Sequence, residues 1–141
     1  MKRLGILAAV FLSLAVGTAH AAATQIVAHK DLGITTLTAE DLESIFLGKK
    51  TLWESGSKVS PVLLVEDSPG GQEFIEKTLS KTVDQYRAYW RRRVFSGGAA
   101  PPRTLASTAE ILDFVAKTPG AIGVVEGPVT DERVKIVTLA K

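Results

Sequence analysis

The loop Ser68-Pro69-Gly70-Gly71-Gln72 has residue types that could bind a small oxyanion. If a helix begins here, the free backbone amides of Gly70, Gly71 and Gln72 point outward from the positive end of the helix dipole, where an anion is favoured. Glycine lets a ligand approach the backbone closely, and the Ser68 hydroxyl could donate a further hydrogen bond. Ser68, Gly70, Gly71 and Gln72 are therefore the candidate ligand-binding residues.

The same loop also suits a plain helix cap. In that interpretation Ser68 caps its own helix and the two glycines only form the turn. The neighbouring Glu66 and Asp67 would repel an anion, which favours the plain cap.

Catalytic chemistry is poorly supported by the residue types. The chain has no cysteine, and neither a Gly-x-Ser-x-Gly nor a His-Glu-x-x-His motif occurs. His29 is the only histidine beyond the first 21 residues, and its place at a strand end favours a surface or hydrogen-bonded role over a ligand role. Adjacent carboxylates do not converge on one face of a helix or strand. We therefore expect no enzyme, no metal and no cofactor; a small hydrolase would need a nucleophile that the sequence does not show.

A second candidate feature is the basic run Arg91 to Arg93. It could gather an acidic ligand or partner, but cations in the last helical turn also complement the helix dipole, which favours a solvated face. Tyr86, Tyr89 and Trp90 share one helix face and are expected in the core rather than in a stacking platform.

The elements that position the loop are a buried strand and a helix. The aliphatic run Val59 to Val65 lacks alternation, which is typical of a strand buried on both faces of a parallel sheet. Pro69 fits the first helical position, with Ser68 as the N-cap. Phe74, Ile75 and Leu79 then mark the inner face of the helix.

The rest of the chain alternates strands with helices. Three further helices are expected to begin after Thr38, Thr82 and Ser107, and three further strands cover residues 25–29, 121–125 and 134–139. Four strands alternating with four helices predict a single layered α/β domain with a mostly parallel sheet flanked by helices.

Residues 1–21 have the pattern of a secretory signal peptide. Lys2 and Arg3 precede an apolar stretch from Leu4 to Val16, which is too short to span a membrane, and Ala19-His20-Ala21 is a small-x-small cleavage site. We expect cleavage after Ala21, with Ala23 as the alternative, and one domain over residues 22–141. Without a cysteine the exported protein is not a lipoprotein. It is expected in the periplasm, with no membrane insertion after cleavage.

Cleavage also changes the charge balance. Taking Lys2 and Arg3 from the 17 basic residues leaves 15, which equals the 15 acidic residues. The pI of about 9.0 therefore depends on the leader. A nearly neutral mature chain argues against nucleic acid as a partner.

Three stretches together resemble a known family. The string Leu42 to Lys50, followed by Trp53 and Gly56, and the string Pro119 to Val125 are similar to recurring segments of the phosphate ABC transporter substrate-binding proteins, with Trp90 to Gly97 between them. The likeness runs from about Ile26 to the C-terminus. It implies a PBP-like domain that resembles one lobe of a type II periplasmic binding protein, whose two α/β lobes close on an oxyanion.

The family's anion loop pairs an arginine at a strand end with a Gly-Ser-Gly-Thr turn at a helix N-terminus. Ser68 and the Gly70-Gly71 pair match that turn, but the strand ends at Leu64-Val65 without an arginine. Because a bidentate arginine is among the strongest contacts to phosphate, the resemblance implies weak or no phosphate binding.

Two hypotheses about function remain open. The first is an extracytoplasmic solute-binding module that takes phosphate or another oxyanion at the candidate loop. The second is an accessory protein that has kept the fold and acts through contact with a membrane transporter or sensor protein. A homodimer is a corollary of the second, because a single lobe has a face that would otherwise meet another lobe.

Overall fold

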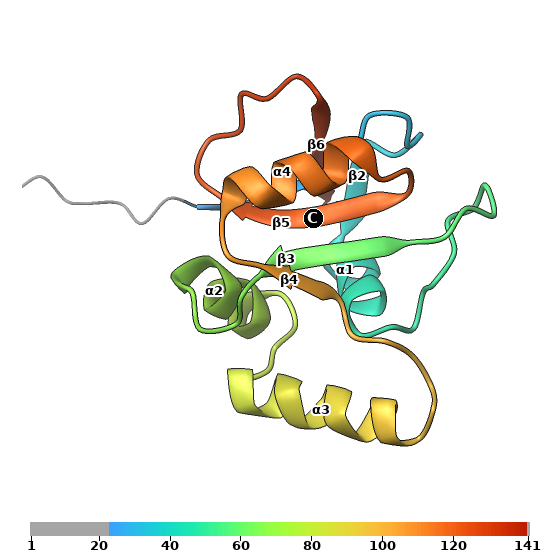
Figure 1. The fold of residues 1–141 in the computed structure, drawn as a ribbon, viewed down its shortest axis with the longest axis vertical. Helices are drawn as coiled ribbons and strands as arrows, with labels where there is room; N and C mark the ends of the chain where they lie inside the picture. The colour runs from blue at the N-terminus through green and yellow to red at the C-terminus, as the bar shows by residue number, and fades with distance from the viewer. Residues whose placement is uncertain (1–22, 141) are drawn as a thin grey trace, which may run out of the picture.

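The computed structural model describes residues 23–140, so the expected leader peptide of residues 1–21 and the cleavage site after Ala21 lie outside the described residues. Ten elements follow one another along this part of the chain (Figure 1). The strands are β1 (Thr24–His29), β2 (Thr36–Thr38), β3 (Ser60–Leu64), β4 (Arg103–Leu105), β5 (Ala121–Glu126) and β6 (Val134–Ala140). The helices are α1 (Ala39–Phe46), α2 (Pro69–Lys77), α3 (Val83–Phe95) and α4 (Thr108–Lys117).

All six strands belong to one sheet in the order β2-β6-β1-β5-β3-β4. β1 runs antiparallel to both of its neighbours, β5 and β6, and the other neighbouring pairs are parallel. The predicted mostly parallel α/β sheet is therefore confirmed. The predicted number of four strands was wrong, because the short edge strands β2 and β4 are two more.

Helices cover both faces of the sheet, which explains the aliphatic runs without alternation. Along β3, Val62 and Leu64 pack under α4, whereas Leu63 between them points to the opposite core with α1, α2 and α3. β5 alternates in the same way: Val125 packs on the side of α4, and Ile122 packs on the opposite side with α1, α2 and α3. Each strand thus contributes to two apolar layers.

The expected helix starts are confirmed by their caps. The hydroxyls of Thr38, Ser68, Thr82 and Ser107 each accept a hydrogen bond from the backbone amide three residues later. Gly48 ends α1 with a φ of +72°, as expected for a glycine after the last helical turn.

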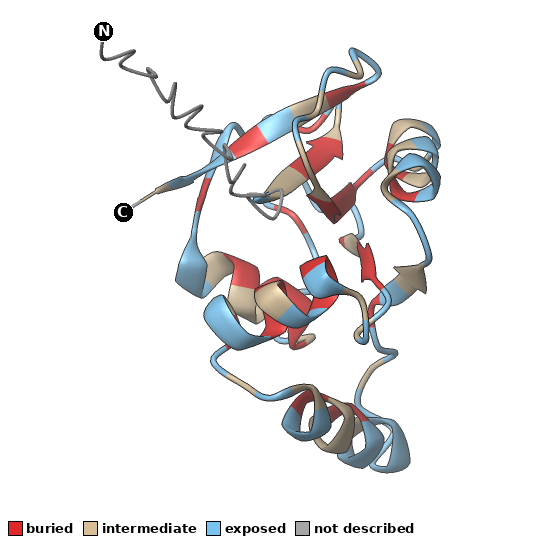
Figure 2. Cartoon of the chain, turned by 90° about the vertical axis from the view of Figure 1, so that its left-hand side faces the viewer, coloured by how far each residue is buried: buried red, intermediate tan, exposed pale blue. Residues whose placement is uncertain are grey.

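Helix α3 is attached to the other elements by one face only. Tyr86 and Trp90 are buried beneath it, and Tyr89 is half-buried. Figure 2 shows that the opposite side of α3, at the bottom of the view, is exposed. The predicted core role of the aromatic residues is confirmed, and the outer side of α3 is exposed.

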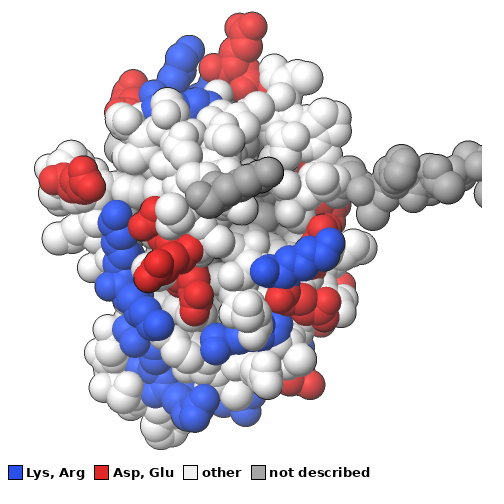
Figure 3. Space-filling view, turned by 180° about the vertical axis from the view of Figure 1, so that it is seen from behind, with Lys and Arg blue, Asp and Glu red and all other residues white. Residues whose placement is uncertain are grey.

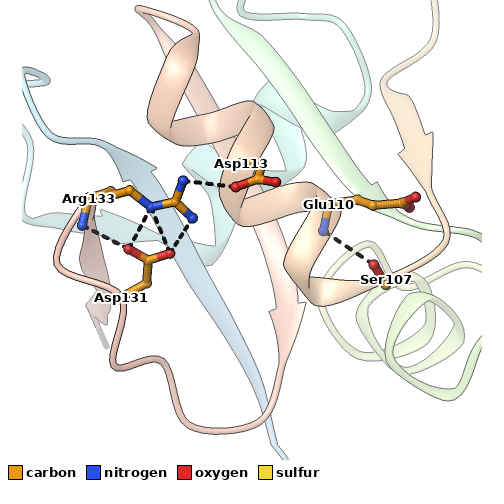
Figure 4. Close-up of polar contacts among 5 residues, drawn as sticks. All are labelled: Ser107, Glu110, Asp113, Asp131 and Arg133. Atoms are coloured by element: carbon orange, nitrogen blue, oxygen red, sulfur yellow. Dashed lines mark hydrogen bonds and ion pairs between the residues drawn. The ribbon is translucent and has the colours of Figure 1, made fainter.

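Ion pairs tie α4 to the connection between β5 and β6. The guanidinium of Arg133 contacts Asp113 on α4 at 2.8 Å and Asp131 at 2.7 Å (Figure 4). At the start of the same helix the Ser107 hydroxyl accepts from the Glu110 amide at 3.2 Å. The carboxylate of Glu110 reaches the amide of Ala106 rather than that of Ser107, so the predicted capping box is only half formed. The ion pair with Asp113 therefore fixes α4 against the segment that precedes β6.

Candidate functional site

The candidate loop lies where β3 ends and α2 begins, as the sequence predicts. The Ser68 amide donates to the carbonyl of Val65 at 2.9 Å and closes the turn. The Ser68 hydroxyl donates to the same carbonyl at 2.6 Å and accepts from the Gly71 amide at 3.1 Å. The hydroxyl proton of Ser68 is therefore committed to the turn and is not available to donate to an anion.

Glu126 occupies the position that sequence reasoning assigned to a bound anion. Its Oε1 atom accepts a hydrogen bond from the Gly70 amide at 2.5 Å. A side chain at residue 70 would collide with the Glu126 carboxylate, so glycine is needed for this close approach. The positive end of α2 thus holds a carboxylate that belongs to the chain itself.

The backbone of Glu126 is held by the second helix that starts at this edge. The Glu126 amide donates to Thr108 Oγ1 on α4 at 3.2 Å, and the same Oγ1 lies 3.4 Å from the carbonyl oxygen of Glu126. Figure 1 shows the starts of α2 and α4 at the same end of β5. Two helix N-termini therefore converge on one glutamate.

The fourth candidate residue, Gln72, also has partners within the chain. Its amide donates to the Ser68 carbonyl at 2.9 Å, and its side-chain amide lies 3.1 Å from Glu76 Oε1. The structure brings the four candidate residues together at one helix start. The Ser68 hydroxyl, the amides of Gly70, Gly71 and Gln72, and the Gln72 side chain each have a partner within the chain.

An arginine does approach the loop, but from α3. Arg87 Nη2 lies 3.0 Å from Asp67 Oδ1 and 3.9 Å from Glu66 Oε2. The guanidinium of Arg87 is therefore paired with the two carboxylates that precede the loop and is not available to an anion.

The three consecutive arginines on α3 separate into two groups. Arg93 turns inward, donates to the Gly48 carbonyl at 3.3 Å and lies over the rings of Tyr89 and Trp90. The predicted solvated face was therefore wrong for this residue, because helical spacing rotates Arg93 toward the core. Arg91 and Arg92 are exposed, as predicted.

The outer side of α3 also carries an exposed aromatic residue. Phe95 is 95% exposed and, with Ala88, borders a shallow depression beside Arg91 and Arg92. Seen from behind, Lys and Arg atoms extend over the lower part of the molecule, where α3 lies (Figure 3). Among the described residues neither Arg91 nor Arg92 lies within 4.0 Å of a carboxylate.

Metal ligands and membrane spans give no further candidate in residues 23–140. No group of three or more potential metal ligands comes together in this part of the chain. No helix described there is long and apolar enough to cross a bilayer. His29 accepts a hydrogen bond on Nδ1 from the Asp31 amide at 3.1 Å, in agreement with the hydrogen-bonded role expected for it.

Comparison with known proteins identifies the fold. No protein-family model and no curated protein matches the sequence. Among solved structures, PstS from Borrelia burgdorferi is similar with a TM-score of 0.65 and 15% identity, over 85% of this chain and 48% of that one. An ABC-type phosphate transport receptor from Vibrio cholerae has a TM-score of 0.62 and 21% identity, over 82% of this chain and 45% of that one.

These similarities show the fold of one lobe of a periplasmic binding protein. The chain spans less than half the length of the two solved proteins. At these identities the likeness concerns the fold and leaves the ligand to be argued from the site itself.

Proposed function

We propose that this chain is an exported module of the phosphate-binding-protein fold that acts by contacting another protein, and that it does not hold phosphate at the start of α2. The observation that carries this proposal is the 2.5 Å contact between the Glu126 carboxylate and the Gly70 amide. An incoming phosphate would have to displace a carboxylate that the start of α2 already binds, on a residue whose backbone is held by Thr108 of α4.

The electrostatics of the loop support the same conclusion. Besides Glu126, the carboxylates of Glu66 and Asp67 lie at this edge, and the nearby Arg87 is paired with both. A dianion would meet like charges without a free guanidinium to offset them.

The contact surface that we propose is the outer side of α3. An exposed Phe95 beside the uncommitted guanidiniums of Arg91 and Arg92 is the combination found at the centre of protein interfaces. It fits a partner with an apolar pocket and an acidic rim, on another exported protein or on the extracytoplasmic part of a membrane transporter or sensor. A two-fold homodimer through this face would place each arginine pair close to its own copy, so we do not propose one.

The first test is calorimetric titration of the mature protein with phosphate and with sulfate. We expect no binding heat for either anion at millimolar concentration. A submicromolar dissociation constant for phosphate would overturn the proposal and would favour the solute-binding hypothesis.

The variant Glu126→Ala extends this test to the loop itself. If the glutamate blocks an otherwise competent anion site at Ser68, Gly70, Gly71 and Gln72, the variant should gain weak phosphate binding that Gly70→Ala abolishes. Phosphate binding by Glu126→Ala that persists with an alanine at residue 70 would place the anion elsewhere and contradict this role for the loop.

The second test concerns the contact surface. A photoreactive phenylalanine analogue at residue 95 is expected to crosslink to one protein of discrete mass in producing cells. Arg91→Glu with Arg92→Glu should abolish that adduct. The same analogue at Ile136, an exposed residue on β6, is the matched control. Equal adducts from residues 136 and 95, or an adduct that tolerates both charge reversals, would overturn the proposed surface.

A further inference from the structure

A cavity at the surface of the described residues lies away from the candidate loop. It has a volume of about 520 Å³ and is bordered by the start of β3, the end of α1, Trp90 on α3 and the loop of residues 98–102. Ser60 and Pro61 border it at the first residues of β3, whereas Gly70 follows the last residues of that strand. The cavity is therefore at the opposite end of the sheet, and its role does not rest on the function proposed above.

The inner walls of this cavity are apolar. Ile45, Val59, Trp90 and Pro102 are buried beneath it, and Phe114 on α4 forms a half-buried side. Leu52 is 56% exposed at the opening, although it is a large aliphatic side chain. A volume of this size lies within the range of pockets that hold drug-sized ligands and far exceeds that of phosphate or sulfate.

The charged side chains that line the cavity are all cations. They are Lys50, Lys58 and Arg103, and no aspartate or glutamate lines it. Within the described part of the chain none of the three lies within 4.0 Å of a carboxylate. The guanidinium of Arg103 lies over the Phe114 ring, 5.0 Å from its centre, which holds its charge beside the apolar wall.

We infer that this cavity is a binding site for an amphipathic anion, with an apolar body against Trp90 and Phe114 and one carboxylate or sulfonate head near Lys58 and Arg103. The apolar walls supply the binding energy through buried area, and the cations Lys58 and Arg103 select the charge of the head group. An inorganic anion would leave the apolar walls in contact with water, and a neutral apolar compound would leave the cations without a partner.

The inference can be tested with 8-anilinonaphthalene-1-sulfonate, whose fluorescence rises in apolar sites. We expect saturable binding at one site on the folded mature protein, with displacement by decanoate and not by decanol. Lys58→Gln with Arg103→Gln should weaken binding about tenfold or more, as expected for the loss of charge-assisted hydrogen bonds. Lys30→Gln with Lys117→Gln removes two exposed cations that do not line the cavity and should leave the affinity unchanged.

A steric variant separates a charge effect from a site effect. Ala100 lines the opening and is exposed, so Ala100→Trp should block the cavity without disturbing the core. Circular dichroism and melting temperature must match the parent protein in every variant. Binding that does not saturate, that survives Ala100→Trp, or that decanol displaces as well as decanoate would overturn the inference.

Discussion

Replacing Glu126 by alanine should destabilise the protein although the residue is at the end of a strand and outside the apolar core. The change removes the 2.5 Å hydrogen bond to the Gly70 amide at the positive end of α2. A hydrogen bond to a charged group contributes about 1.5–3 kcal/mol, and the helix-dipole term overlaps with it. Because Gly70 is buried, its amide would also lose the partner that Glu126 supplies from the end of β5. We therefore expect a loss of about 2 kcal/mol.

The assay is urea denaturation at pH 7. The slope of the unfolding free energy against urea concentration should be the same in variant and parent, which checks that both unfold in two states. For a domain of this size a loss of about 2 kcal/mol corresponds to a melting temperature lower by roughly 8 °C. Glu126→Gln keeps an acceptor oxygen without the charge and should lose about half as much. Glu54→Ala is the matched control, since Glu54 is exposed and has no hydrogen bond or ion pair among residues 23–140.

A double-mutant cycle with Gly70→Ala tests the contact directly. The new methyl group would collide with the Glu126 side chain, so its cost should shrink when that side chain is already absent. Additive losses, or a Glu126→Ala loss within about 0.5 kcal/mol of the Glu54→Ala control, would refute the assignment of the glutamate as the anion of α2.

Three further predictions concern the scaffold. Trp53→Phe removes a buried hydrogen bond of 2.9 Å from Nε1 to the Gly120 carbonyl and should cost about 1–3 kcal/mol in chemical denaturation; an unchanged midpoint contradicts it. Gly120→Ala should cost about 2 kcal/mol or more, because φ is +82° and a methyl group would collide with the Lys58 carbonyl; a calorimetric scan like that of the parent would disprove it. Hydrogen bonds from Thr38 lower the pKa of Asp41 below 3.8. The ionised Asp41 therefore contributes fully to the stability of the fold above the pKa that this residue has in the unfolded chain, and the contribution is lost as the pH falls through its lower folded pKa. Asp41→Asn should therefore flatten the fall in stability below about pH 4, and acid titrations that coincide with the parent's would count against it.

The layered fold could be predicted because burial and capping leave local patterns. The strand at Val59 to Val65 was recognisable from its aliphatic run, and the start of α2 from Ser68 followed by Pro69. The edge strands β2 and β4 have three residues each, too few to show a period. The direction of β1 was also out of reach, because alternation of side chains is the same in parallel and antiparallel strands.

The candidate site was predictable only in part, because its decisive contact is not local. Ser68 and Gly70 could be assigned to a helix start from their own sequence, but Glu126 is 56 residues from Gly70. The sequence feature that could have indicated Glu126 is an acidic residue at the end of a buried strand, directly before a glycine. Only the pairing of β5 beside β3 brings that carboxylate to the start of α2.

The two ends of the sheet differ in charge, and helix dipoles explain only part of the difference. Carboxylates at the helix starts near Gly70 and cations near helix ends both stabilise the fold. Lys50 follows the end of α1 closely and fits this explanation. Lys58 precedes β3 and Arg103 begins β4, so neither belongs to the last turn of a helix. Their place beside an apolar cavity calls for another cause, and an anionic ligand there supplies one that the dipoles do not.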